Sequence, residues 1–261
     1  MSKKGKIEIR NLNKTFARLD SGSTLCAIGN IDLTIEPGEF VSIVGASGCG
    51  KSTLLRIIAG LETPTQGEIL CDGKKIEDTN PDRGLMFQEH TLYPWLTVRK
   101  NIIFALKASG RYEEYKDDID IFLEKAGLLD FSNSYPHQLS GGMRQRAALV
   151  RSLAVSPDVL LLDEPLGALD SFTRMTLQDE IIRLWKEREN TMILITHDVD
   201  EAVYLSQRIV IMTPRPGVIT EVINVPMTYP RNRGASDFEA LRIHLLKQLN
   251  FASEAQQDYY L

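Results

Sequence analysis

The sequence is poor in cysteine, and its cysteines are not spaced for a metal site or a disulfide framework. Cys26, Cys49 and Cys71 are odd in number and lie more than 20 residues apart. The close cysteine or histidine pairs that bind zinc are missing. This pattern argues against a small disulfide-held secreted domain and predicts a reducing compartment.

Long apolar runs are also missing. Apolar stretches such as Val159–Leu162 are short, whereas a transmembrane helix needs about 20 apolar residues. The first ten residues carry lysines with no apolar segment behind them, so we expect no signal peptide. If the protein works at a membrane, we expect the membrane-spanning part to be supplied by a separate chain.

An excess of positive charge is absent as well. The 30 lysines and arginines are outnumbered by 35 aspartates and glutamates, which gives a net charge of −5. Sequence-independent nucleic-acid binding needs a basic face, so nucleic acid is not an expected partner. The length of 261 residues suits one large α/β domain, or one domain with an insertion.

Strand-like and helix-like patterns alternate along most of the chain. Such alternation predicts an α/β fold with a mostly parallel sheet and helices on both faces. The predicted strands are residues 6–10, 31–35, 40–44, 68–71, 85–87, 159–162, 192–196 and 208–212, and the predicted helices are residues 52–59, 139–155, 174–186 and 199–205.

Two segments depart from this alternation. Residues 89–138 mix charged and apolar residues at helical periods, which predicts a helical insertion. We expect a main domain over residues 5–225, with a helical subdomain at about 89–155 within it. Residues 226–261 form a tail whose apolar residues follow one side of a helix, and we expect it to pack on the domain.

A phosphate-binding loop is predicted where a strand, a glycine-rich turn and a helix follow one another. Glycines let successive backbone N–H groups point at phosphate oxygens, and the helix adds its positive end. A tight strand–helix turn is the structural alternative. The motif G-x-x-x-x-G-K-[ST] is matched by Gly45, Ala46, Ser47, Gly48, Cys49, Gly50, Lys51 and Ser52.

The side chains of this loop suggest their roles. Lys51 would supply positive charge to the outer phosphates of ATP, and the Ser52 hydroxyl would bind Mg²⁺. Thr53 would add a hydroxyl near the inner phosphate. ATP and Mg²⁺ are therefore the expected ligands.

Two carboxylates follow the apolar strand at residues 159–162. At the carboxyl end of a parallel strand they would face the ligand crevice. We expect Asp163 to hold Mg²⁺ and Glu164 to act as the general base for the attacking water. A helix N-cap pair before Pro165 is the alternative interpretation.

A second glycine-containing helix start occurs at residues 139–146, LSGGMRQR, which we call the signature. Ser140 is a natural N-cap, and a helix start binds anions. A plain cap would need only the serine, whereas Gly141 and Gly142 follow it here. The stretch thus predicts a second anion-binding helix start and not only an ordinary N-cap.

These motifs together resemble the ATP-binding-cassette ATPase family over roughly residues 5–225. Gln88 follows a strand, Asp170 lies in a turn after the two carboxylates, and His197 follows the strand at 192–196. The order and the spacings match: 23 residues separate Ser140 from Asp163. The resemblance implies a P-loop NTPase core, an N-terminal antiparallel β subdomain and a helical subdomain that carries the signature.

The resemblance also implies a head-to-tail homodimer with two ATP molecules at its interface. Ser140, Gly141 and Gly142 would act in trans on the γ-phosphate bound by the partner copy. Asp170 would communicate across the dimer.

The same resemblance assigns catalytic roles. His197 would contact the γ-phosphate and position the attacking water, which Glu164 would polarise. Gln88 would contact Mg²⁺ or that water and sense the membrane subunit, so the Mg²⁺ ligands would be Ser52, Gln88 and Asp163.

Phe16 allows two interpretations. The family places an aromatic residue against adenine at this point of the chain. A core position in an N-terminal strand explains Phe16 equally well.

The finer resemblance is to importer ATPases for nitrate, sulfonates, taurine, bicarbonate and thiamine-precursor pyrimidines. It rests on residues 87–98, 135–138 and 213–217. Within the last of these, Arg215-Pro216-Gly217 is also typical of a plain turn. Residues 92–95 would belong to a groove for a permease helix, or would pack within the insertion.

Multi-spanning permease subunits are therefore expected partners, with a solute-binding protein engaged indirectly. The alternative is a soluble cassette ATPase without a transport role. Only 52 residues separate Gln88 from Ser140, too few for the long coiled coils of DNA-repair relatives. Translation relatives usually carry two cassettes, and this chain has one. The transported solute is not indicated by the sequence.

Overall fold

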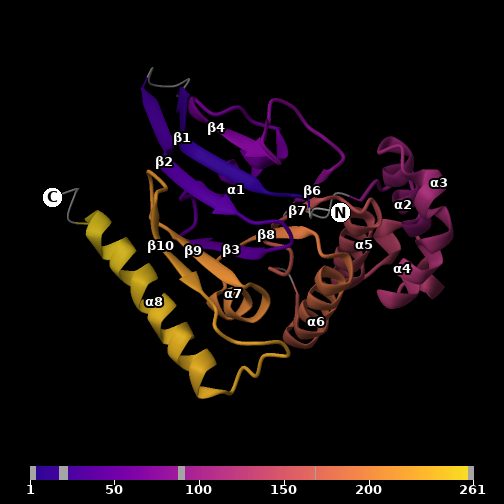
Figure 1. Ribbon diagram of the computed structural model, residues 1–261. Coiled ribbons are helices and arrows are strands. Elements are labelled where there is room, and N and C mark those ends of the chain that lie inside the picture. The colour runs from indigo at the N-terminus through magenta and orange to yellow at the C-terminus, as the bar shows by residue number, and fades with distance from the viewer. Residues whose placement is uncertain (1–3, 18–22, 88–91, 168, 258–261) are drawn as a thin grey trace. The chain divides into compact units, whose positions relative to one another are not determined.

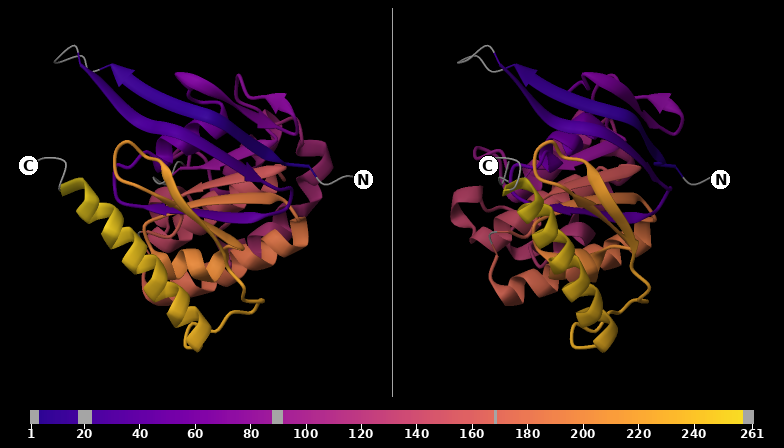
Figure 2. Two further views of the ribbon diagram at one scale, coloured as in Figure 1. Left: turned by 60° about the vertical axis from the view of Figure 1, so that its left-hand side comes forward. Right: turned by 90° about the vertical axis from the view of Figure 1, so that its left-hand side faces the viewer.

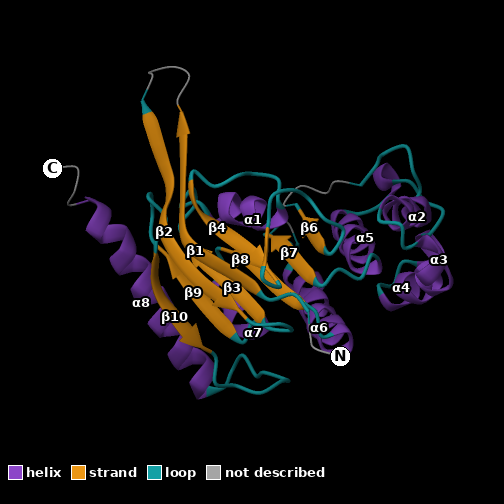
Figure 3. Ribbon diagram, turned by 45° about the horizontal axis from the view of Figure 1, so that its top comes forward, coloured by secondary structure: helices purple, strands orange, loops and turns teal. Residues whose placement is uncertain are grey.

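Alternating apolar residues build an antiparallel sheet near the N-terminus. In the computed structural model, which describes residues 4–17, 23–87, 92–167 and 169–257, its strand order is β2-β1-β4-β5. Ile7 pairs with Ile35 on one side and with Cys71 on the other, both antiparallel (Figure 3). The expected antiparallel β subdomain is confirmed. The strands are β1 (Ile7–Ala17), β2 (Thr24–Ile35), β4 (Gln66–Cys71) and β5 (Lys74–Lys75).

These strands belong to the first of two compact units, Met1–Thr79 with Glu189–Leu261. The same unit holds β3 (Phe40–Gly45), which pairs in parallel with both β8 (Thr191–Thr196) and β9 (Arg208–Met212). Every residue of β3 and β8 is buried, as expected for parallel strands covered on both faces. The edge strand β10 (Ile219–Asn224) runs antiparallel to β9.

Three helices complete this unit: α1 (Lys51–Ala59), α7 (Val199–Leu205) and α8 (Ser236–Gln257). Helix α8 runs beside β10 (Figure 2), where His244 lies 3.3 Å from Glu221. Phe238 and Leu245 of α8 are buried. The amphipathic tail thus packs its apolar side inward.

The second unit, Asn80–Arg188, is mainly helical. Its strands β6 (Arg83–Met86) and β7 (Val159–Asp163) pair in parallel. Helices α2, α3 and α4 gather in one cluster (Figure 1), and both α2 and α4 contact α5. The helices are α2 (Val98–Ala108), α3 (Tyr112–Tyr115), α4 (Ile119–Lys125), α5 (Gly141–Ala154) and α6 (Ser171–Arg188), with short 3-10 turns at Lys116–Asp118, Leu129–Phe131 and Pro136–Gln138.

The predicted strands and helices are all present, and the α/β class is confirmed. The sequence patterns missed β5 and β10. They placed the start of α5 slightly too early and the start of α6 slightly too late. Within the described ranges, no helix is long and apolar enough to cross a membrane.

The start of the tail clamps the C-terminal end of α7. Arg231 is buried, and its Nη1 donates to the carbonyls of Val203 at 2.5 Å and Ser206 at 2.6 Å. The Tyr229 hydroxyl donates to the Leu205 carbonyl at 2.6 Å. Because a helix leaves its last carbonyls without helical partners, these side chains satisfy groups that would otherwise be orphaned.

We expect Tyr229→Phe to lower the free energy of unfolding by about 1 kcal/mol at neutral pH, since one hydrogen bond is lost. Burial raises the pKa of the Tyr229 phenol from 10.0 to about 12. The unfolded chain therefore loses this proton first, and the neutral phenol's contribution falls as pH rises from about 10 towards 12. In urea unfolding, the difference in the free energy of unfolding between the wild type and Tyr229→Phe should be smaller at pH 11 than at pH 8. A constant difference between the two proteins would contradict this account.

Candidate nucleotide-binding site

The phosphate loop forms because a fully buried strand must turn sharply into a helix. Strand β3 ends at Gly45, and α1 begins at Lys51. Gly48 and Gly50 have left-handed φ angles of 76° and 105°. A Cβ on Gly50 would lie 2.7 Å from the Ala27 carbonyl oxygen, so only glycine is accommodated without strain.

Lys51 is turned into this loop. Its side chain is 5% exposed, and Nζ donates to the carbonyls of Gly45 at 2.8 Å and Ala46 at 2.9 Å. The charge is thus held on the concave side of the loop at the positive end of α1, where an anion is favoured.

The other predicted loop residues lie around this concavity. Ser47 and Gly48 are exposed, whereas the Cys49 side chain is buried with Sγ 3.7 Å from Lys51 Nζ. Ser52 and Thr53 are half-buried in the first turn of α1. Their hydroxyls therefore lie at the start of α1, directly after the phosphate loop.

His197 lies at the same edge of the sheet as the phosphate loop. Strands β3 and β8 pair in parallel with Val44 opposite Thr196, so Gly45 and His197 are the next residues of their strands. His197 is exposed. The turn after it is fixed by Asp198, whose Oδ1 accepts from the N–H groups of Asp200 and Glu201 at the start of α7.

Phe16 is not a fully buried core residue. Its side chain is 36% exposed, and Lys14 Nζ lies 4.8 Å from the ring centroid. Lys14 is itself buried and donates to Glu62 at 2.6 Å. A ring with one free face leaves the adenine contact possible, and that role stays a prediction.

The second unit carries the two carboxylates at the end of β7. Asp163 is buried, and Glu164 is half-buried. Glu164 has a φ of 46°, a left-handed conformation that is uncommon outside glycine, asparagine and aspartate. A backbone outlier at the carboxyl end of a buried strand is typical of functional positions.

The signature forms a capped helix start in the same unit. Ser140 Oγ accepts from the Met143 N–H at 3.3 Å and is the N-cap of α5. A Cβ on Gly142 would lie 3.0 Å from Thr173 Cγ2, so packing against α6 explains this glycine. A Cβ on Gly141 would come no closer than 4.0 Å to the neighbouring side chain, Arg144. Packing among the described residues of this unit therefore does not explain Gly141.

Asp170 also has a local structural role. Its Oδ1 accepts from the Thr173 N–H at 3.0 Å. Hydrogen bonds from Thr173 hold the pKa of the Asp170 carboxyl below its ordinary value. Gln88, the remaining predicted residue, lies outside the described residues.

Residues 92–95, predicted either to form part of a groove for a permease helix or to pack within the insertion, contribute two rings to an aromatic cluster. The Tyr93 ring centroid lies 5.6 Å from that of Trp95 and 4.7 Å from that of Phe104. Trp95 is 69% exposed, so it does not simply pack within the insertion. The sequence analysis did not predict that Phe104, which lies on α2, belongs to this cluster.

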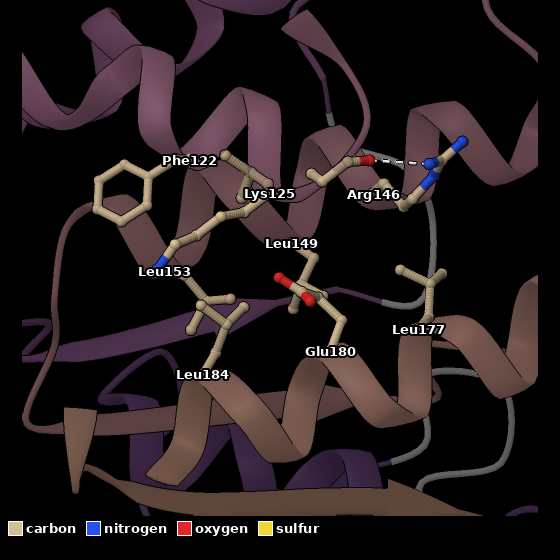
Figure 4. A pocket seen from close by; sticks show the side chains of 10 residues that line it. Phe122, Lys125, Arg146, Leu149, Leu153, Leu177, Glu180 and Leu184 are labelled. Carbon is tan, nitrogen blue, oxygen red and sulfur yellow. Dashed lines mark hydrogen bonds between the residues drawn. The ribbon is translucent and has the colours of Figure 1, made fainter. Parts of the chain in front are cut away.

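A separate hollow in the second unit holds none of the predicted site residues. It lies among α4, α5 and α6 (Figure 4) and is lined mainly by apolar residues. Its charged groups are already engaged: Arg146 donates to the Ala126 carbonyl, and Glu180 pairs with Arg183. The hollow is a seam between packed helices and offers no nucleotide-binding groups.

Comparison with known proteins assigns the family. A family model described as ABC transporter matches residues 28–167. The chain belongs to this family. It is an ABC ATPase, whose activity is ATP hydrolysis coupled to transport.

Among curated ABC relatives, the aliphatic sulfonates import ATP-binding protein SsuB of Bacillus thuringiensis subsp. konkukian is 46% identical over 242 residues, covering 93% of this chain and 95% of its own length. The nitrate import ATP-binding protein NrtD of Synechocystis sp. is 47% identical over 232 residues, covering 87% and 86%. A solved dimeric post-hydrolysis state of an ATP-binding cassette, bound to ADP and Pi, matches with a TM-score of 0.75 and 34% identity, covering 85% of this chain and 100% of that one.

The contrast between the two signature glycines yields a stability test. Neither has a left-handed φ. Replacement by alanine should therefore raise the free energy of unfolding by up to about 0.5–1 kcal/mol through helix propensity, where space allows. We expect Gly141→Ala to keep or raise the stability of the protein. Gly142→Ala should be less stable than Gly141→Ala by about 1 kcal/mol, because its methyl group must displace Thr173. Equal urea midpoints for the two variants would refute this distinction.

Proposed function

We propose that this chain is the ATP-hydrolysing subunit of an importer that carries a small anion or sulfonate-like solute through a separate permease. The import ATP-binding proteins for aliphatic sulfonates and nitrate, similar along almost the whole chain, support this class of cargo. The soluble, non-transport alternative has no such support among them.

The observation that carries the catalytic assignment is Glu164 in its left-handed conformation directly after β7. Strained backbone conformations of this kind occur often at active sites. In this proposal Glu164 is the general base that polarises the attacking water. His197, at the sheet edge beside the phosphate loop, positions that water and contacts the γ-phosphate. Gln88 contacts the same water or the metal.

Mg²⁺ is the metal that the donor chemistry favours. The Ser52 hydroxyl and the Asp163 carboxylate are hard oxygen donors, as are the phosphates of ATP, and Mg²⁺ prefers such ligands. Together with Gln88, Ser52 and Asp163 would hold the ion, which neutralises developing charge on the phosphates when bound. Asp163 is buried at the end of its strand, which suits a residue that must be held in one orientation.

A second copy of the chain would complete each nucleotide site in a head-to-tail dimer. Ser140, Gly141 and Gly142 would then offer a helix N-terminus to the γ-phosphate bound by the partner. The open space beside Gly141 supports this role, since none of the described residues of its own unit requires a glycine there. Phe172, two residues after Asp170 in sequence, is 85% exposed and would be covered by the partner.

The permease is proposed to dock on the aromatic cluster of Tyr93, Trp95 and Phe104. The exposed rings of Trp95 and Phe104, both in contact with Tyr93, suit the apolar face of a short partner helix. The chain would therefore work as a peripheral subunit on the cytoplasmic face of the inner membrane. A solute-binding protein would meet the permease, not this chain.

We expect Glu164→Gln to bind ATP with an affinity close to that of the wild type and to lose at least about 100-fold in turnover, since a general base contributes about that much. Phosphate release and binding of a fluorescent ATP analogue would be measured on the purified chain. Cells that carry this variant should also lose uptake of the labelled sulfonate or nitrate.

Glu180→Gln is the matched control. It makes the same chemical change on α6 of the same unit, where Glu180 pairs with Arg183, and it should retain normal turnover. Rapid hydrolysis by Glu164→Gln would remove Glu164 as the base. Normal solute uptake by a hydrolysis-deficient variant would instead overturn the proposed cargo.

A further inference from the structure

The turn between β9 and β10, residues 213–218, lies against the phosphate loop. Strand β9 pairs in parallel with β3, and Met212 is opposite Gly45. The segments that follow these two strands therefore leave the sheet side by side. We call residues 213–218 the RPG turn, after its central Arg215-Pro216-Gly217.

The backbone of this turn approaches the phosphate loop closely at Gly217. The Gly217 N–H donates to the Ala27 carbonyl at 3.0 Å, and its carbonyl accepts from the Gly29 N–H at 3.1 Å. A Cβ on Gly217 would lie only 2.0 Å from the Cys49 carbonyl oxygen. Glycine is therefore required here by contact with the phosphate loop itself, and a plain turn would not need it.

Arg215 makes the directional contact between the turn and the loop. Its Nε donates to the Gly48 carbonyl at 2.8 Å, and its Nη2 would lie 3.0 Å from a Cβ on Gly48. Gly48 has a φ of 76°, and a glycine allows the peptide that follows it more than one orientation. The hydrogen bond from Arg215 selects one of them.

That orientation also fixes the amide on the other side of the same peptide bond. In a planar trans peptide the Gly48 carbonyl and the Cys49 N–H point in opposite directions. The Cys49 N–H donates inward to the Ala46 carbonyl at 3.3 Å, the same oxygen that accepts from Lys51 Nζ. Holding the Gly48 carbonyl outward thus keeps the Cys49 N–H on the side of the loop that Lys51 occupies.

We propose that Arg215 is a positioning residue for nucleotide binding: it fixes the Gly48–Cys49 peptide and so holds the phosphate loop in the shape that receives the phosphates. Preorganisation of this kind lowers the cost of ordering the loop around its ligand. Its guanidinium also adds positive charge at the rim of the loop. The proposal rests on the loop binding ATP phosphates and does not depend on the roles of Glu164 or His197.

The test compares Arg215→Ala and Arg215→Lys in ATP hydrolysis by the full chain. Because one exposed, charge-assisted hydrogen bond is lost, Arg215→Ala should raise KM for ATP about fivefold and leave kcat within about twofold. Lysine can donate to the same carbonyl, so Arg215→Lys should recover much of the loss. The dissociation constant of a fluorescent ATP analogue should follow KM.

Arg10→Ala is the matched control, since Arg10 is an exposed arginine on β1 that pairs with Glu8. It should leave KM unchanged. An unchanged KM in Arg215→Ala would overturn the proposal, as would a lower melting temperature with unchanged KM, or an equal rise in KM in Arg10→Ala. Lys51→Ala, measured alongside, distinguishes failure of the Arg215 proposal from failure of the proposed ATP site. Normal ATP binding by that variant would show that the phosphate loop does not bind ATP.

Discussion

The parallel pairing of β3 with β8 and β9 is the constraint on which the nucleotide site depends. Its register places the phosphate loop, His197 and the RPG turn directly after three neighbouring strands. Apolar burial holds this register, because every residue of β3 and β8 is removed from solvent. Slippage by one residue would turn these buried side chains to the wrong face. The geometry of the site is therefore fixed by the core beneath it.

Local backbone devices then aim the chemical groups. Left-handed glycines curl the phosphate loop, and a left-handed Glu164 ends β7. Ser140 caps α5, which begins within the signature, and Asp198 caps α7, which follows His197. At the far end of α7, Arg231 donates to the last carbonyls. Each of these features fixes a peptide or a helix end.

Much of this could be predicted from the sequence. The phosphate loop, the carboxylates after β7 and the capped signature are local patterns, and the structure has the predicted elements around them. Contacts between distant segments could not be predicted, because they depend on which strands become neighbours. The bond from Arg215 to Gly48 spans 167 residues. The different surroundings of Gly141 and Gly142 likewise arise from the packing of α6, which periodicity does not reveal.

We propose that this ABC ATPase drives a membrane importer whose permease docks on the aromatic cluster of Tyr93, Trp95 and Phe104. This docking can be measured by purifying the tagged full chain from native membranes in mild detergent and identifying its partners by mass spectrometry. A multi-spanning membrane protein should co-purify with the wild type and be depleted with a Trp95→Ala variant. Recovery of soluble partners alone, with no membrane protein, would contradict it.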